Sequence, residues 1–285
     1  MPDAKKRSLE KELHSLSRGV ATEAQVAYEI GFYFGQTKNI VVIHDLRLEI
    51  NGRVAQIDHL LINRCLEVYV LETKTFGSGL SVNEAGKFST SHEGREIGIP
   101  SPIEQNQRHI SVLRDAFKEI GLPTRLGIPM SPSFHSVVLI SPKAVIRRPM
   151  ASKVDLSSVI KSDQFFSWYN KTIDETKLGD VIGVLKVCSP QTIQDLAAKL
   201  VELHRPLRTD YVKRFDLADA LLQSGRSFDR VSRTEDEDPI DTKEPSKYFC
   251  AACRISITNV VAKFCWNHKP RFGGRAYCRP CQAKF

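Results

Sequence analysis

The chain has 285 residues, of which 41% are hydrophobic and 26% are charged, a composition typical of a globular protein with one large core or two domains. No apolar run approaches the roughly 18 residues that a membrane-spanning helix needs, and the N-terminus lacks the apolar stretch of a signal peptide. These features exclude a membrane partner and predict a cytoplasmic location.

The periodicity of apolar residues predicts a mixed sheet with helices packed against it, because helix, strand and helix patterns follow one another. Asn51-Gly52 is typical of a hairpin turn between two strands. In chain order we expect a charged lead-in helix over 1–18, a helix over 20–34, strands over 39–50, 53–63 and 66–75, a loop or short extra hairpin over 77–98, a helix over 102–120, a strand over 134–141, and a mostly helical stretch over 155–225 with its clearest helices over 192–204 and 211–222.

Two acids and a lysine stand at unusual places in these strands. Alternation along the third strand puts Glu72 and Lys74 on one face, at the end of an apolar run. Asp58 lies in the preceding strand, so pairing of the two strands around Asn63-Arg64 would bring Asp58 close to Glu72. Two neighbouring carboxylates repel unless a cation lies between them, and oxygen ligands favour Mg²⁺ or Mn²⁺.

This combination of groups is suited to phosphodiester hydrolysis. A metal held by Asp58 and Glu72 would bind a phosphate oxygen and acidify a water molecule. Lys74 would position that water and stabilise the developing negative charge. The structural alternative is an exposed sheet edge with a Glu72–Lys74 ion pair and a capping Asp58, and the spacing alone does not choose between the two.

Four short motifs in the first half of the chain resemble, in order, the nuclease-related domain (NERD) family of the PD-(D/E)xK nuclease superfamily. They are Gly19-Val20-Ala21-Thr22-Glu23, Ala55-Gln56-Ile57-Asp58-His59, Val70-Leu71-Glu72-Thr73-Lys74 and Pro102-Ile103-Glu104-Gln105. The resemblance covers about residues 19–142 and implies a PD-(D/E)xK-like α/β fold. It also implies Asp58 and Glu72 as metal ligands, Lys74 as the catalytic lysine, and Glu23 and Gln105 as further members of the site.

Other polar residues near these motifs have competing interpretations. Glu23 shares a helix face with apolar residues, which suits a site residue, but a carboxylate near a helix start is also favoured by the helix dipole. Gln105 and Gln107 both flank the apolar stripe of their helix, and only the resemblance favours Gln105. His59 points away from Asp58, so a structural histidine is expected, as it is for His44 and Asp45.

Five of the seven cysteines lie in the last 36 residues, where two C-x-x-C pairs, Cys250/Cys253 and Cys278/Cys281, are separated by 24 residues. Four thiolates closing a tetrahedral site are typical of structural Zn²⁺, here in a zinc ribbon whose gap a short hairpin can span. Cys265 and His268 are also spaced as a ligand pair, so Cys265 replacing one of the four is an alternative.

The positive charge of the chain is confined to the same segment. Residues 246–285 hold eight Lys and Arg and no Asp or Glu, and the remaining 33 basic residues equal the 33 acidic ones. A compact basic module indicates a polyanionic partner, most simply nucleic acid. Exposed aromatic residues of the module would add stacking on unpaired bases.

Five segments and one main function follow from these features. The segments are a lead-in helix over 1–18, a nuclease-like domain over 19–142, a mostly helical extension over 143–225, a flexible acidic linker over 226–246 and a zinc-ribbon module with four cysteine ligands over 247–285. The function is that of an Mg²⁺- or Mn²⁺-dependent nuclease acting on DNA, with the ribbon aiding substrate binding. The alternatives are a non-catalytic protein that binds nucleic acid or a partner, and a ribbon that serves protein interaction.

Overall fold

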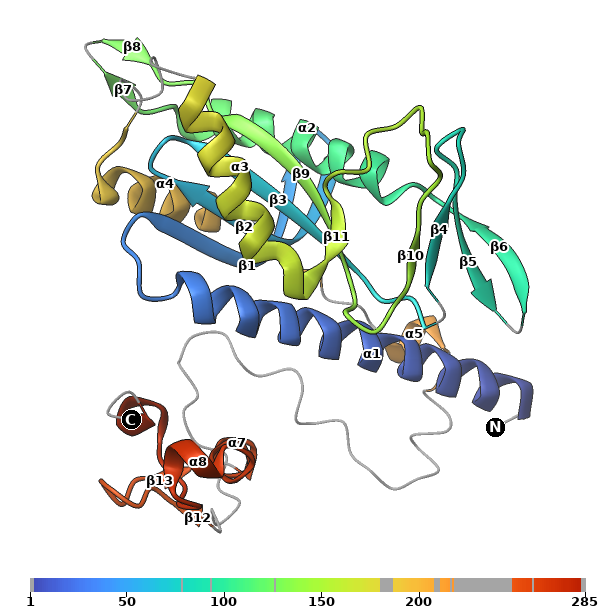
Figure 1. Cartoon of the computed structure of the whole chain (residues 1–285), viewed down its shortest axis with the longest axis vertical. Coiled ribbons are helices and arrows are strands. Elements are labelled where there is room, and N and C mark those ends of the chain that lie inside the picture. Colours follow the sequence, from blue (N-terminus) through green and yellow to red (C-terminus); the bar gives the residue numbers. More distant parts are fainter. Residues whose placement is uncertain are drawn as a thin grey trace. The chain divides into compact units, whose positions relative to one another are not determined.

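The computed structural model describes residues 3–77, 79–92, 94–125, 127–179, 187–207, 211–215, 217, 248–257 and 259–282. They belong to two compact units, Met1–Ala220 and Leu221–Phe285, which we describe separately (Figure 1). None of the helices in the described ranges is long and apolar enough to cross a membrane. The linker predicted over 226–246 and half of the helix predicted over 211–222 lie outside these ranges.

The first unit begins with one long helix, α1 (Asp3–Phe34), where we expected a lead-in helix and a separate second helix. Gly19 lies at the expected junction without ending the helix, which fits the modest cost of glycine in a helix interior, about 1 kcal/mol. Only the C-terminal part of α1 is anchored in the core, through Val26, Ile30 and Phe34. The helix predicted over 20–34 contains this anchored part, although its periodic stripe included the exposed Val20 and omitted Val26.

A five-stranded mixed sheet forms the centre of the unit, in the order β1-β2-β3-β9-β11. The first three strands are antiparallel neighbours, whereas β9 is parallel to both β3 and β11. The strands are β1 (Ile40–Ile50), β2 (Arg53–Asn63), β3 (Glu67–Lys74), β9 (Ser133–Ile140) and β11 (Val159–Lys161). The predicted mixed sheet is therefore present, and β11 is an edge strand that the sequence patterns did not predict.

Helices cover both faces of this sheet (Figure 1). One face packs against α2 (Pro102–Ile120) and α4 (Pro190–Glu202), and the other packs against α1 and α3 (Phe165–Gly179). Ser101 caps α2 by accepting a hydrogen bond from the backbone N–H of Glu104 at 3.2 Å, and Pro102 occupies the first turn. These two signals fix where α2 begins and hence which of its residues face the end of β3.

A smaller sheet and several short elements complete the unit. The segment expected as a loop or extra hairpin forms two antiparallel pairs, β4 with β5 and β5 with β6, and β10 joins β4 in parallel. The elements are β4 (Leu80–Val82), β5 (Phe88–His92), β6 (Arg95–Ile99), β10 (Ile146–Arg147), β7 (Thr124–Arg125), β8 (Ile128–Pro129), the 3-10 helix η1 (Ser162–Gln164) and α5 (Tyr211–Arg214).

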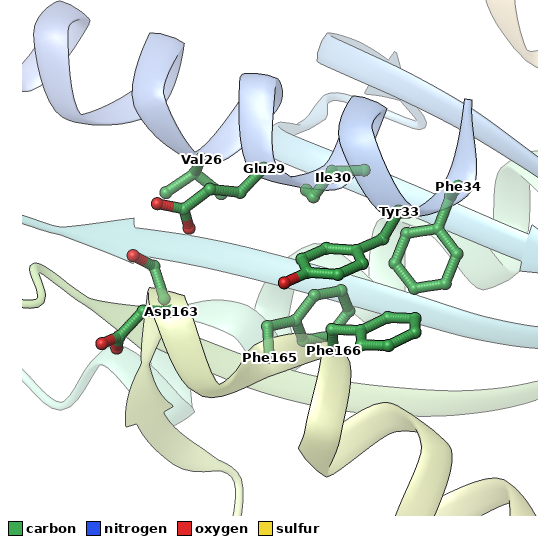
Figure 2. Close-up of a pocket in the computed structure, with 9 residues that line it drawn as sticks. Val26, Glu29, Ile30, Tyr33, Phe34, Asp163, Phe165 and Phe166 are labelled. Atoms are coloured by element: carbon green, nitrogen blue, oxygen red, sulfur yellow. The ribbon is translucent and has the colours of Figure 1, made fainter. Parts of the chain in front are cut away.

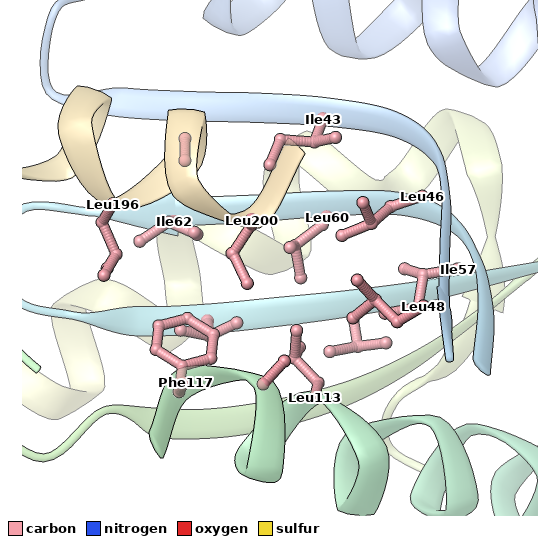
Figure 3. Close-up of a cluster of buried hydrophobic side chains, with 14 of the residues drawn as sticks. Ile43, Leu46, Leu48, Ile57, Leu60, Ile62, Leu113, Phe117, Leu196 and Leu200 are labelled. Carbon is pink, nitrogen blue, oxygen red and sulfur yellow. The ribbon is translucent and has the colours of Figure 1, made fainter. Parts of the chain in front are cut away.

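The β1–β2 ladder is interrupted where Asp45 lies opposite Asp58. Pairing runs from Ile40↔Asn63 to Ile50↔Arg53 without a slip in register, but Asp45 and Asp58 form no pair. Asp45 has a φ of 55°, a left-handed conformation that a short polar side chain tolerates. The strands bend here, and residues on both sides of the bend, such as Leu46 and Leu60, enter one core (Figure 3). Strict alternation would place them on opposite faces.

In its described residues, 248–257 and 259–282, the second unit has two short strands and three helices. Strand β12 (Tyr248–Phe249) pairs with β13 (Ser256–Ile257), and α7 (Asn259–Asn267), α8 (Lys269–Phe272) and α9 (Arg279–Gln282) follow. The first C-x-x-C pair lies in the turn of this hairpin. The gap between the two pairs contains α7 and α8, so the short hairpin that we expected to span it is replaced there by helix.

Candidate functional site

The end of β3 carries a buried carboxylate, Glu72, whose side chain contacts two predicted site residues. Glu72 is 3% exposed. Its Oε1 atom lies 2.7 Å from Lys74 Nζ and accepts a hydrogen bond from Gln105 Nε2 at 2.8 Å. Lys74 Nζ also donates to Gln105 Oε1 at 3.1 Å. The helix α2 therefore holds Glu72 and Lys74 together through one amide side chain.

Asp58 reaches the same place from β2. The register His59↔Leu71, continued by one residue, sets Asp58 opposite Glu72. Asp58 Oδ2 accepts a hydrogen bond from the backbone N–H of Thr73 at 2.7 Å, so its carboxylate crosses to the neighbouring strand. The pairing of these two strands was expected, and it brings the two acids together as the sequence predicted.

Burial and neighbouring acids disfavour ionisation of Asp58 and Glu72. Burial, the charge of Glu72 and the charge of Glu23 raise the pKa of Asp58 from 3.8 to about 7, against an opposing effect of the Thr73 N–H and Lys74. Burial and Glu23 also raise the pKa of Glu72, although Lys74 and Gln105 act in the opposite direction. Acids clustered in this way gain most from a nearby cation.

Glu23 joins the cluster from the opposite layer of the fold. It lies on α1, and Thr22 next to it accepts a hydrogen bond from the hydroxyl of Thr75, just beyond β3, at 2.7 Å. Burial and Asp45 raise the pKa of Glu23, whereas Lys74 lowers it. The structure thus brings all five predicted residues, Glu23, Asp58, Glu72, Lys74 and Gln105, to one end of β3.

The structural alternative of an exposed ion pair is half right. The Glu72–Lys74 ion pair exists, and Asp58 does cap a backbone N–H, but Glu72 is buried rather than exposed. Moreover, Glu72 Oε2 is a buried oxygen without a hydrogen-bond partner. Such an atom is costly in a folded protein unless something binds it. The ion pair alone leaves half of this carboxylate unsatisfied.

The sequence analysis did not identify one neighbour of Glu72, His109. His109 Nδ1 lies 3.5 Å from Glu72 Oε2, too far for a good hydrogen bond. Burial, Lys74 and Arg108 lower the pKa of His109 to about 4. The signal available in the sequence was its position four residues after Gln105, which puts both side chains on one face of a helix. Gln107, the competing candidate, is exposed.

The two histidines expected to be structural face each other on β1 and β2. His44 Nδ1 lies 2.8 Å from His59 Nδ1, and His59 is 2% exposed. Burial and the charge of His44 lower the pKa of His59 to about 3, so the ring is neutral. Its Nε2 atom has no partner, so the expected histidine is buried but only partly satisfied.

The four cysteines of the C-x-x-C pairs form a second cluster, in the C-terminal module. The Sγ atoms of Cys250, Cys253, Cys278 and Cys281 all lie within 4.8 Å of one another. This separation and four thiol ligands fit a tetrahedral metal site, so the cluster can bind a metal such as zinc. Among the described residues it is the group of three or more possible ligands that meets this distance limit.

Cys265 and His268 are held by other contacts. Cys265 is fully buried, and its sulfur accepts hydrogen bonds from Tyr277 N at 3.3 Å and Gln282 Nε2 at 3.3 Å. His268 Nδ1 lies 2.8 Å from the carbonyl oxygen of Phe264, one helical turn earlier. Cys265 thus belongs to the core of the module, whereas His268 is exposed and bonded to α7, so the four cysteines of the C-x-x-C pairs are the better ligand set.

Comparison with known proteins shows that part of the first unit is similar to a nuclease-related domain. Residues 18–141 match the family model described as nuclease-related domain (NERD), and this range contains all five residues of the carboxylate cluster. The chain is also 31% identical over 148 residues to a protein kinase, ORF74, of Ictalurid herpesvirus 1 (strain Auburn). That alignment covers 51% of this chain and 22% of the viral protein, so the chain spans about a fifth of that relative. No solved structure matches the chain.

Proposed function

We propose that the nuclease-related domain is a metal-dependent phosphodiesterase that cleaves DNA, with its active site at the end of β3. The observation that carries this proposal is the clustering of Asp58, Glu72 and Lys74, in which one buried carboxylate oxygen of Glu72 has no hydrogen-bond partner. A domain that only needed a stable sheet would not gain from two repelling acids, Asp58 and Glu72, at one site. Repulsion of this kind is typical of sites that receive a cation.

The residues present fit a hard divalent cation. Asp58 and Glu72 would hold it, because both offer carboxylate oxygens and Glu72 Oε2 is unsatisfied. Such an ion polarises a bound phosphate and lowers the pKa of a water molecule near it. The carboxyl proton that the raised pKa retains on Asp58 would be displaced when the site fills. Mg²⁺ and Mn²⁺ both suit an oxygen-only donor set.

Lys74 would supply the positive charge on the protein side of the reaction. Its ammonium is held by Glu72 and Gln105, so its position is fixed before substrate arrives. A fixed ammonium at this place can orient the attacking water and stabilise negative charge on the phosphate oxygens. Gln105 is then a positioning residue, because it contacts both side chains and carries no charge.

The C-terminal module would provide affinity for the substrate. Its eight basic residues and the absence of acidic ones favour contact with the phosphate backbone, and zinc would stabilise its fold. Phe249 is 59% exposed and can stack on an unpaired base. Cytoplasmic location stays a prediction from the sequence.

A non-catalytic binding protein is the second candidate, and one observation favours it. The Glu72–Lys74 pair and the Thr73–Asp58 hydrogen bond satisfy much of the cluster without any ion. A protein that keeps this arrangement permanently would bind nucleic acid without turnover. The two candidates differ in whether purified protein hydrolyses a phosphodiester bond.

The test is a cleavage assay on supercoiled plasmid, single-stranded DNA and RNA, with Mg²⁺, Mn²⁺ or a chelator. We expect metal-dependent cleavage of DNA by the wild type, reduced on the order of 100-fold or more in Asp58→Ala, Glu72→Ala and Lys74→Ala. Glu119→Ala, which removes an exposed acid of α2, is the matched control and should cleave normally. A wild-type protein that cleaves none of these substrates would support the binding protein instead. Normal cleavage by the Asp58→Ala, Glu72→Ala and Lys74→Ala variants would show that the active site is elsewhere.

A further inference from the structure

A cavity separate from the carboxylate cluster lies between α1 and the segment that leads into α3 (Figure 2). Its volume is about 160 Å³, more than a single water molecule needs. The walls come from the C-terminal half of α1 and from residues 162–166. Glu29, which lines it, follows Glu23 by six residues on α1, or about 9 Å of helix rise.

Two polar atoms of the cavity lining lack partners. Ser162 is 5% exposed, and its hydroxyl has no hydrogen-bond partner. Glu29 Oε1 accepts a hydrogen bond from Gln25 Nε2 at 2.9 Å, but Glu29 Oε2 is buried and unpaired. A buried carboxylate oxygen and a buried hydroxyl that both lack partners, on residues lining one cavity, indicate that a hydrogen-bond donor belongs there.

The charge of the lining favours a cation over a neutral donor. Asp163 adds a second carboxylate and is exposed, so it lies at the mouth. None of the nine residues that line the cavity is a lysine, arginine or histidine. In Figure 2 the carboxylates of Glu29 and Asp163 lie on one side of the view and the rings of Phe34 and Phe166 on the other.

Aromatic rings form the apolar part of the walls. Tyr33 stacks on Phe166 with ring centroids 4.0 Å apart and planes 9° apart, which fixes both rings. Phe34 lies edge-on to Phe166 with centroids 5.8 Å apart. Rigid aromatic walls beside carboxylates favour an organic cation, because they bury its apolar stem while the carboxylates attract its charge.

We propose that this cavity binds an organic cation with an ammonium or guanidinium head and a short apolar stem. The head would donate hydrogen bonds to Glu29 Oε2 and Ser162 Oγ, and the stem would lie against Phe165 and Phe166. Asp163 would attract the cation at the mouth. A free amine or a lysine or arginine side chain of another protein presents this chemistry equally.

The test measures saturable binding of ethylammonium and ethylguanidinium to the full chain, by calorimetry and by the rise in melting temperature at constant ionic strength. Sodium and tetramethylammonium are controls for positive charge without N–H donors. Propanol is the control for an uncharged molecule with an apolar stem. We expect Glu29→Gln to weaken binding at least about tenfold and Ser162→Ala to weaken it less. Glu175→Gln makes the same change on an exposed residue of α3 and should bind like the wild type.

Two further comparisons decide the ligand and the proposal. Putrescine and a blocked Gly-Lys-Gly peptide carry the same head group, and the tighter binder identifies a free amine or a protein side chain as the source. Equal responses to ethylammonium and sodium, or unchanged affinity in both Glu29→Gln and Ser162→Ala, would overturn the proposal and leave a cavity that holds only water. DNA cleavage does not enter this test, so its outcome is independent of the nuclease proposal.

Discussion

At the scale of single residues, Asp58 and Glu72 have surroundings that favour their protonated forms. The pKa of Asp58 is raised to about 7, and that of Glu72 is raised as well, because burial and neighbouring acids oppose ionisation. In metal-free protein near neutral pH, the carboxyl of Asp58 therefore holds a proton for much of the time. Filling the site with a cation removes this proton, which couples metal affinity to pH.

The pH dependence of stability follows from the direction of this shift. Between pH 4 and pH 7 the folded protein holds a proton on Asp58 that the unfolded chain has released, so wild-type stability falls as pH rises through this range. Asp58→Asn cannot titrate. With chelator present, its stability relative to wild type should therefore rise from pH 4 to pH 8, by on the order of 3 kcal/mol. Urea denaturation at the two pH values measures this difference.

Asp115→Asn provides a control of opposite sign. Hydrogen bonding to Lys118 and the charge of Arg53 lower the pKa of Asp115, so its ionised form stabilises the fold above the pKa of the unfolded chain. Asp115→Asn should therefore lose stability relative to wild type as pH rises from 3 to 6. Parallel pH profiles for the two variants would contradict the assignment of a buried, repelling environment to Asp58.

At the scale of elements, α2 is held on the sheet by Asn106, which lies between Gln105 and the exposed Gln107. Asn106 is fully buried, and its Nδ2 donates to Val70 O at 2.7 Å and Ser136 Oγ at 3.1 Å. One side chain thus ties α2 to both β3 and β9. Because Gln105 is the preceding residue on the helix, this contact also positions the Gln105 side chain relative to Glu72.

Removing this contact should loosen the helix and the site together. Asn106→Ala leaves a small cavity and unpaired buried carbonyl groups, so we expect a loss of about 2–4 kcal/mol in the free energy of unfolding. Gln107→Ala changes an exposed residue and should cost less than about 0.5 kcal/mol. Chemical denaturation of both variants measures the contrast. Equal stability of Asn106→Ala and Gln107→Ala would mean that Asn106 does not anchor α2.

Sequence patterns predicted the elements that carry local signals. The Asn51-Gly52 turn fixed the first hairpin, and Ser101-Pro102 fixed the start of α2. The short strands β10 and β11 were missed, because strands of two or three residues exist only through pairing with a distant partner. The bend at Asp45 and Asp58 was missed for a related reason, since alternation assumes an uninterrupted ladder.

The residues of the candidate site were predictable to different degrees. Alternation was enough to place Glu72 and Lys74 on one face, and hairpin pairing was enough to bring Asp58 beside them. Helical periodicity could not separate Gln105 from Gln107, because the rotation of α2 on the sheet depends on Asn106. His109 had no partner in the sequence pattern, because its contact with Glu72 arises only when α2 packs over the end of β3.

At the scale of the whole molecule, the cysteine cluster gives a simple stoichiometry. Purified protein should contain one zinc ion per chain, because one tetrahedral site has four thiol ligands. Cys250→Ser and Cys278→Ser should lose it, whereas Cys265→Ser should retain zinc although its buried contacts change. Metal analysis of the four proteins measures this, and zinc lost only in Cys265→Ser would reverse the ligand assignment.

The surplus positive charge lies in the C-terminal module, apart from the candidate active site, so DNA affinity and DNA cleavage can be tested separately. A chain ending at Asp241 keeps the first compact unit and loses all eight surplus positive charges. It should bind duplex DNA more weakly, and the slope of log affinity against log salt should fall by about 0.9 for each lost phosphate contact. Cleavage at saturating DNA should fall less than affinity does. Equal affinity and equal slope for both chains would assign the module to protein interaction instead.

The nuclease proposal places metal binding and cleavage in one site. The most direct test is a Mn²⁺ titration that records both Mn²⁺ binding and the single-turnover cleavage rate. In wild type, the rate should rise as one site fills. Asp58→Asn should weaken that site about tenfold or more and shift the rate curve equally, whereas Lys74→Ala should still bind Mn²⁺ but lose cleavage. The contradicting result is that Asp58→Asn still cleaves DNA at Mn²⁺ concentrations at which its Mn²⁺ site is empty.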